Sequence, residues 1–256
     1  MLPHRINLKY FVEDPEAVDM ARFTPLFHRW IQNHIVEGLL IDVADYKHMH
    51  EGPGIILIGH EGDYAMDVGG GRPGLLYTRK REMNGDLPYQ LRTVFRLALT
   101  ACHLLEAEPC LEGQITFLTG EAELTFLDRL RTPNEPATFD ALHESVRAVV
   151  GELYGDPDIG LESINDDLGQ CFAIRITALG APDLLGLARD LEPVFSHMCC
   201  DRQGILEKAD ILVAGSEKGF QAVRKRNLGG CQIRMGPFAT TIAEARPQVK
   251  PCFRLV

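Results

Sequence analysis

No apolar run in the 256-residue sequence approaches the roughly 18 residues that a membrane-spanning helix needs. The first ten residues, MLPHRINLKY, also lack the basic segment followed by an apolar stretch that marks a secretory signal. We therefore expect a cytoplasmic protein that does not associate with membranes. The seven cysteines include no CxxC pair. An odd number of cysteines without that spacing favours free thiols over a disulfide framework.

Several signatures of known chemistry are absent as well. The sequence has no GxSxG motif and no HExxH motif, which argues against the hydrolases that use a nucleophile elbow or that zinc helix. The segment GGGRPG, from Gly69 to Gly74, lacks the GK[ST] ending of a phosphate-binding loop. The acidic segment that starts at Asp156 has Leu161 where an EF-hand loop requires glycine. We therefore expect neither an EF-hand nor a P-loop.

The composition, with 45% apolar and 24% charged residues, is typical of a folded globular protein. The formal net charge of −10 argues against a role on nucleic acid. The charge is unevenly spread: residues 1–200 hold 16 Lys/Arg and 31 Asp/Glu, whereas residues 201–256 hold 10 and 5. We expect a main domain over residues 1–200 and a basic C-terminal extension over residues 201–256 that packs on it.

Hydrophobic periodicity predicts alternating groups of strands and helices. The cleanest helical stripe lies between Tyr89 and Leu105. Another helix is expected to begin with Thr24 as N-cap, and Gly155 marks the end of a third. The expected strands are INLKYFV, LLIDVADY, GIILIGHE, GLLYTRKRE, QITFL, ELTFL and CFAIRITAL, and a last helix is expected over residues 183–191.

This order predicts an α+β fold, with an antiparallel or mixed sheet and helices packed on one face. Two stretches of the chain follow the order strand, helix, strand, strand. They suggest two diverged ferredoxin-like units, although no residue-level repeat supports the doubling.

The segment YKHMHEGPGIILIGHEGDY, from Tyr46 to Tyr64, concentrates histidines and carboxylates around one apolar run. A hairpin that turns near residues 51–54 would place His60 opposite roughly Val43. Val43 lies five residues from His48, on the order of 16 Å along a strand, so His48 and His60 cannot share a metal ion. The far end of such a hairpin would instead gather His60 with nearby carboxylates: Asp42, Asp45, Glu61 and Asp63.

A histidine oriented by a carboxylate serves either as a general base or as a metal ligand with its supporting partner. We therefore predict His60 and Glu61 as catalytic residues. Asp42, His60 and Asp63 are the predicted ligands of a divalent metal ion. The short basic run at residues 79–81 is the only dense one in the acidic body. With Arg72, its residues Arg79 and Arg81 are predicted to meet an anionic ligand.

Two hypotheses for the function remain open. In the first, the protein binds metal or performs acid/base, hydrolase-type chemistry on a small molecule. In the second, it is a non-enzymatic ligand-binding module or a homo-oligomeric assembly module. The first requires His60 and its carboxylates to converge in a concave pocket, whereas the second lets them point into solvent.

Overall fold

The computed structural model describes residues 3–49, 52–155, 158–164 and 167–179, together with Leu184 and Leu187. Its described helices are α1 (Phe23–Asn33), α2 (Leu87–Glu106) and α3 (Pro136–Tyr154), with short 3-10 turns at Pro15–Ala17, Met20–Arg22, Gly69–Gly71 and Pro109–Leu111. The described strands are β1 (Ile6–Val12), β2 (Leu40–Asp45), β3 (Ile55–Gly59), β4 (Gly62–Asp67), β5 (Gly74–Arg79), β6 (Phe117–Phe126), β7 (Asp158–Ser163) and β8 (Phe172–Leu179).

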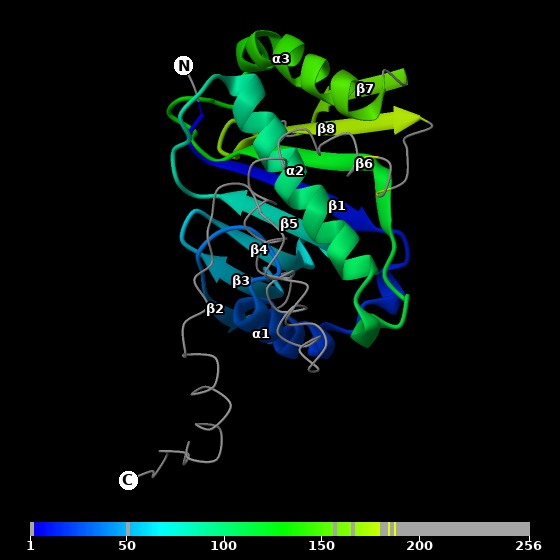
Figure 1. Ribbon diagram of the computed structural model, residues 1–256. Coiled ribbons are helices and arrows are strands. Elements are labelled where there is room, and N and C mark those ends of the chain that lie inside the picture. Colours follow the sequence, from blue (N-terminus) through cyan, green and yellow to red (C-terminus); the bar gives the residue numbers. More distant parts are fainter. Residues whose placement is uncertain are drawn as a thin grey trace, which may run out of the picture. The chain divides into compact units, whose positions relative to one another are not determined.

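These strands form one sheet in the order β2-β3-β4-β5-β1-β6-β8-β7 (Figure 1). Every described strand pairing is antiparallel. The predicted α+β class with an antiparallel sheet is thus confirmed. β1 lies between β5 and β6, so it joins strands β2 to β5 and strands β6 to β8 into a single sheet. The ferredoxin-like doubling is not confirmed.

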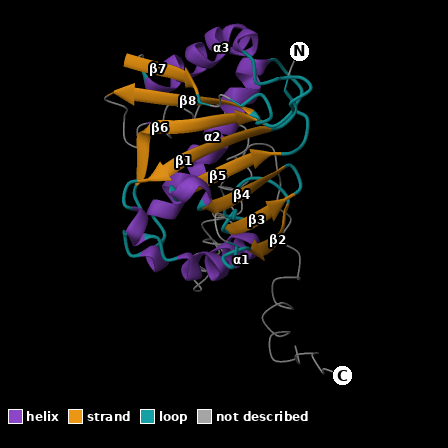
Figure 2. Ribbon diagram, turned by 180° about the vertical axis from the view of Figure 1, so that it is seen from behind, coloured by secondary structure: helices purple, strands orange, loops and turns teal. Residues whose placement is uncertain are grey.

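One face of the sheet carries the hydrophobic core. Although Lys9 and Phe11 on the opposite face of β1 are also buried, the alternate residues Ile6, Leu8 and Tyr10 are the least exposed, at 1% or less. They belong to the same core as the apolar side chains of all three helices. Helix α2 runs across the strands in Figure 1 and lies behind them in the reversed view of Figure 2.

The predictions for α1, α2 and α3 hold with small shifts at the ends. α2 begins after Asp86, whose carboxylate accepts a hydrogen bond from the backbone N–H of Tyr89, as an N-cap does. α3 ends at Gly155, which adopts a left-handed conformation with φ of 73°. α1 begins at Phe23 after Arg22, one residue before the predicted cap at Thr24.

Three strands differ from expectation. β4 was not predicted, and it lies directly after the His60–Glu61 turn. The segments QITFL and ELTFL contribute to one long strand, β6, rather than to two. Part of the acidic segment that resembles an EF-hand loop forms the edge strand β7.

The described part of the chain contains no helix that is both long and apolar enough to cross a membrane. Within the described residues, Cys102 and Cys110 are free thiols, in agreement with the prediction for these two residues, and burial raises the pKa of Cys102 well above its usual value. The cysteines after Cys171, most of the expected helix over residues 183–191 and the whole basic segment 201–256 lie outside the described residues.

Candidate functional site

One end of the sheet brings together segments that are far apart in the sequence. β1 starts there, and its first residue, Ile6, pairs with Arg79 at the end of β5. Arg79 in turn pairs with Gly62 at the start of β4. The segment before β1, the start of β2, the β3–β4 turn and the segment after β5 therefore meet at this end.

The β3–β4 turn consists of His60 and Glu61, and hydrogen bonds hold it from both sides. On the β2 side, the backbone N–H of His60 donates to the carbonyl of Leu39 over 2.8 Å. The Leu39 N–H donates to Glu61 Oε2 over 3.2 Å. On the β5 side, the N–H groups of Lys80 and Arg81 donate to the carbonyl of Glu61 over 2.9 and 3.2 Å. The turn is thus fixed relative to both neighbouring strands.

His60 and Glu61 also contact each other directly. His60 Nδ1 lies 3.1 Å from Glu61 Oε1, and both side chains are more than two-fifths exposed. The N–H of Leu39 lowers the pKa of Glu61, partial burial raises it, and the contact with His60 lowers it further. The two predicted catalytic residues therefore form a carboxylate–imidazole pair at the surface.

The predicted metal ligands have other partners. Asp42 pairs with Ile58, and its carboxylate accepts a hydrogen bond from the N–H of Val43. Asp63 Oδ1 accepts a hydrogen bond from the Gly59 N–H over 3.0 Å and lies 2.8 Å from Lys80 Nζ. Within the described residues, no group of three His, Cys, Asp or Glu side chains could hold a metal ion.

The register of the β2–β3 hairpin differs from the predicted one. Val43 pairs with Leu57 rather than with His60. The difference arises because the strands begin to pair at Asp45 and Ile55, after a connection that occupies Tyr46 to Gly54. His48 is exposed in this connection.

The three predicted anion-binding arginines do not lie together. Arg72 precedes β5, forms a two-point ion pair with Glu121 over 2.7 and 2.9 Å, and packs over the Phe11 ring. Arg79 ends β5 and donates from Nε to the carbonyl of Arg81 over 2.9 Å. Arg72 and Arg81 are nine residues apart across an extended strand, on the order of 30 Å. Only Arg81 belongs to the pocket at this end of the sheet.

That pocket has a volume of about 310 Å³ and is lined by Arg5, Ile41, Gly59, His60, Lys80 and Arg81. The sequence-based prediction included His60 and Arg81 but missed Arg5 and Lys80. Lys80 belongs to the basic run that the sequence analysis identified. Arg5 has no comparable signal, because its place beside Lys80 depends on the pairing of β1 with β5.

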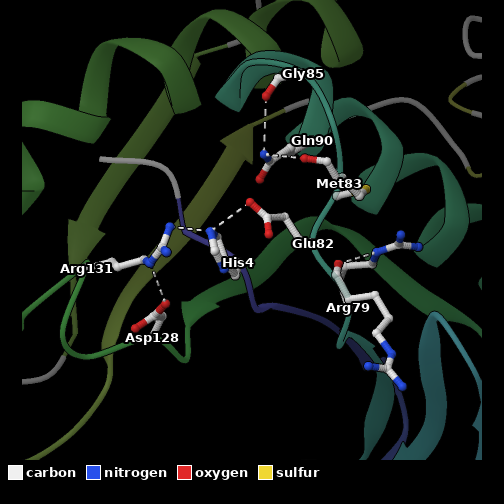
Figure 3. A network of polar contacts seen from close by, with 9 residues as sticks. His4, Arg79, Glu82, Met83, Gly85, Gln90, Asp128 and Arg131 are labelled. Carbon is white, nitrogen blue, oxygen red and sulfur yellow. Dashed lines mark hydrogen bonds and ion pairs between the residues drawn. The ribbon is translucent and has the colours of Figure 1, made fainter.

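A polar network holds the segment that follows β5 (Figure 3). His4 Nε2 lies 3.1 Å from Glu82 Oε1, and His4 also contacts Arg131. The buried amide of Gln90 donates from Nε2 to the carbonyls of Met83 and Gly85 over 3.3 and 3.4 Å. These contacts tie the segment to the residues before β1 and to α2, so the backbone that carries Lys80 and Arg81 is held in place.

No family model, curated protein or solved structure matches this chain. In the described part of the chain, the fold and the site define an α+β domain with a cationic pocket at one end of an eight-stranded antiparallel sheet. The case for a function therefore rests on the geometry and charge of that pocket.

Proposed function

We propose that the protein binds a small anionic ligand, with phosphate as the reference chemistry, in the pocket formed by Arg5, His60, Lys80 and Arg81. The observation that carries the proposal is the concentration of three cationic side chains and one imidazole around about 310 Å³ of space. The chain as a whole has a formal net charge of −10. A cationic pocket in an acidic protein concentrates anions locally.

The charges in this pocket are only partly compensated. The guanidinium groups of Arg5 and Arg81 make no ion pair with any described residue, whereas Lys80 pairs with Asp63. Elsewhere in the described chain, arginines commonly have carboxylate partners: Arg22, Arg29, Arg72, Arg92, Arg96, Arg131 and Arg175. Two uncompensated guanidinium groups beside one pocket favour an anionic ligand from solution.

The donor set suits an oxyanion. A guanidinium group offers paired N–H donors that match the oxygens of phosphate or carboxylate, and lysine adds a compact point charge. Protonated His60, supported through Nδ1 by Glu61, can donate through Nε2. The carboxylate of Asp63 already binds Lys80 and the Gly59 N–H, which favours the anion over the divalent metal ion predicted from Asp42, His60 and Asp63.

The test is calorimetric titration of the full chain with inorganic phosphate at low ionic strength, on the order of 20 mM, where screening is weak. We expect saturable binding that weakens as salt is added. The double variant Lys80→Met/Arg81→Met should lose about tenfold or more in affinity, because charge-assisted hydrogen bonds are lost. The matched control is Lys47→Met, since Lys47 pairs with Asp45 at the other end of β2.

Binding that persists in the double variant, or that Lys47→Met weakens equally, would contradict the proposal. A titration repeated with chelator present separates direct binding from binding through a metal ion. Loss of binding with chelator would favour the metal proposal instead.

The contact between His60 Nδ1 and Glu61 Oε1 supports a second candidate, acid–base chemistry on the bound ligand. In that case the protein should release phenol from phenyl phosphate, and His60→Gln should abolish the release. A wild-type protein that binds phosphate but leaves phenyl phosphate intact would restrict the function to binding.

A further inference from the structure

We infer that the ligand of this pocket is an organic phosphate whose apolar body lies against Ile41 and Leu39. The inference rests on the proposed anion-binding function and specifies the ligand class for the same site. It follows from three features of the structure: the size of the pocket, its apolar wall and the fixed position of that wall beside the cationic groups.

The pocket is larger than an inorganic oxyanion requires. Its volume of about 310 Å³ falls at the lower end of the range of roughly 300 to 1,000 Å³ that is usual for sites of small organic ligands. Arg5, His60, Lys80 and Arg81 account for one part of its lining, and Ile41 forms an apolar part. A ligand that fills the pocket therefore needs an anionic end and an apolar end.

The apolar wall is exposed to a degree that is unusual for aliphatic side chains. Ile41 is 57% exposed and its neighbour Leu39 is 62% exposed. A single exposed aliphatic residue needs no explanation. Here Ile41 lies near the start of the edge strand β2 and lines the pocket, and Leu39 directly precedes that strand. A ligand that covers them removes apolar surface from water.

The position of this wall relative to the charges is set by hydrogen bonds. Leu39 accepts from the His60 N–H and donates to Glu61 Oε2, so the start of β2 is tied to the turn that carries the imidazole. Glu61 also accepts from Lys80 and Arg81 through its carbonyl. The same turn thus fixes both the apolar wall and the cationic groups, and a ligand can contact both without rearrangement of the backbone.

The experiment compares inorganic phosphate with methyl, butyl and phenyl phosphate in titrations of the full chain. We expect affinity to rise with the size of the apolar group, by between about two- and fourfold for each added methylene that is buried. Ile41→Ser should remove most of this gain and should weaken butyl phosphate far more than inorganic phosphate. Lys80→Met should lower the affinity for every ligand in the series. The control, Leu179→Ser, changes a leucine that is 74% exposed at the last residue of β8, away from the pocket. It should change neither the affinity for inorganic phosphate nor the gain along the series.

The outcomes separate the two proposals. If inorganic phosphate binds but affinity does not rise along the series, or if Ile41→Ser weakens inorganic phosphate as much as butyl phosphate, the pocket takes a bare anion and the inference is wrong. If no member of the series binds, the proposed function itself is wrong. Thermal melting of each variant verifies that it folds. Ile41→Ser is expected to fold, because Ile41 is an exposed residue of an edge strand.

A phosphate with an apolar body occurs both in soluble compounds and in lipids. Sedimentation with phosphatidylcholine vesicles, with and without phosphatidic acid, distinguishes these sources. Binding that requires phosphatidic acid identifies a lipid phosphate, and binding of butyl phosphate without vesicle binding identifies a soluble one. Equal binding to both kinds of vesicle would contradict the inference, because the phosphate group would then not be recognised.

Discussion

Asp63 and Lys80 form an ion pair across the ends of β4 and β5, with Lys80 Nζ 2.8 Å from Asp63 Oδ1. Asp63 Oδ1 also accepts a hydrogen bond from the Gly59 N–H, so the carboxylate supports the β3–β4 turn while it neutralises one cation of the pocket. An anion that binds in the pocket competes with Asp63 for Lys80.

Asp63→Asn should therefore strengthen the binding of inorganic phosphate. The amide oxygen can still accept from the Gly59 N–H, whereas the competing charge is lost. Since partly exposed ion pairs are worth about 0 to 1 kcal/mol, we expect an affinity gain of about two- to fivefold by calorimetry. The control is Asp42→Asn, which removes the same charge on β2, where the carboxylate accepts a hydrogen bond from the nearby Val43 N–H. Weaker phosphate binding by Asp63→Asn would contradict this account of the pocket.

The hydroxyl groups of Tyr10 and Tyr154 lie 2.9 Å apart inside the core, between β1 and α3. Burial raises the pKa of Tyr10 well above its usual value, so both hydroxyls remain neutral and act only as hydrogen-bond partners. Tyr154→Phe leaves the Tyr10 hydroxyl buried without this partner, which should cost about 1 to 3 kcal/mol of unfolding free energy. In urea denaturation, the double variant Tyr10→Phe/Tyr154→Phe should lose less unfolding free energy than the sum of the losses of the two single variants. Strict additivity would show that the hydrogen bond contributes nothing.

Gly54 precedes β3 with φ of +66°, and a Cβ at this position would lie 2.0 Å from the Met66 carbonyl oxygen. Gly71 has a similar φ of +70° with no neighbouring atom within 4 Å. Gly71→Ala should therefore cost only the left-handed backbone strain, about 1 to 2 kcal/mol. Gly54→Ala should lose more than twice as much unfolding free energy, because the strand backbone must also move. Equal losses in urea denaturation would show that β3 and β4 can separate at little cost.

The ion pair between Arg72 and Glu121 predicts a specific pH dependence. Arg72 lowers the pKa of Glu121 below its usual value of 4.5, and partial burial opposes the shift. Because the pKa is lower in the folded state, the pair stabilises the fold above pH 4.5 and loses this contribution as the pH falls through the depressed pKa. Glu121→Gln should thus cost up to about 1 kcal/mol at neutral pH and nothing in strong acid, as measured by denaturation across that range. A loss that is constant with pH would contradict the assignment.

The fold was predictable where periodicity is strong and local. The stripe of α2 and the alternation in β1 both follow from side chains that face one continuous core. β4 escaped prediction because only the two-residue turn of His60 and Glu61 separates it from β3, and the segment GIILIGHE, which includes this turn, was predicted as one continuous strand. β7 escaped because Asp158 and Glu162 give it the acidic character of a loop.

The site was only partly predictable for a related reason. His60 and Glu61 are adjacent in the sequence, and their contact needs no knowledge of the fold. Arg5 and Lys80 line the same pocket because β1 lies beside β5. No local sequence pattern indicates that pairing. The separation of Arg72 from Arg81, by contrast, follows from the predicted strand GLLYTRKRE that lies between them, and β5 agrees with it.

The most direct test of the anion-binding pocket is its location by NMR. Titration of the isotope-labelled full chain with inorganic phosphate should shift the backbone amide signals of His60, Glu61, Lys80 and Arg81 together, with one common dissociation constant. Their amides should respond because the turn and the segment after β5 share hydrogen bonds through the Glu61 carbonyl. The same titration of Lys80→Met/Arg81→Met should produce much smaller shifts. Phosphate-dependent shifts that leave these four amides unchanged and instead surround another basic residue, such as Arg92, would contradict the central claim.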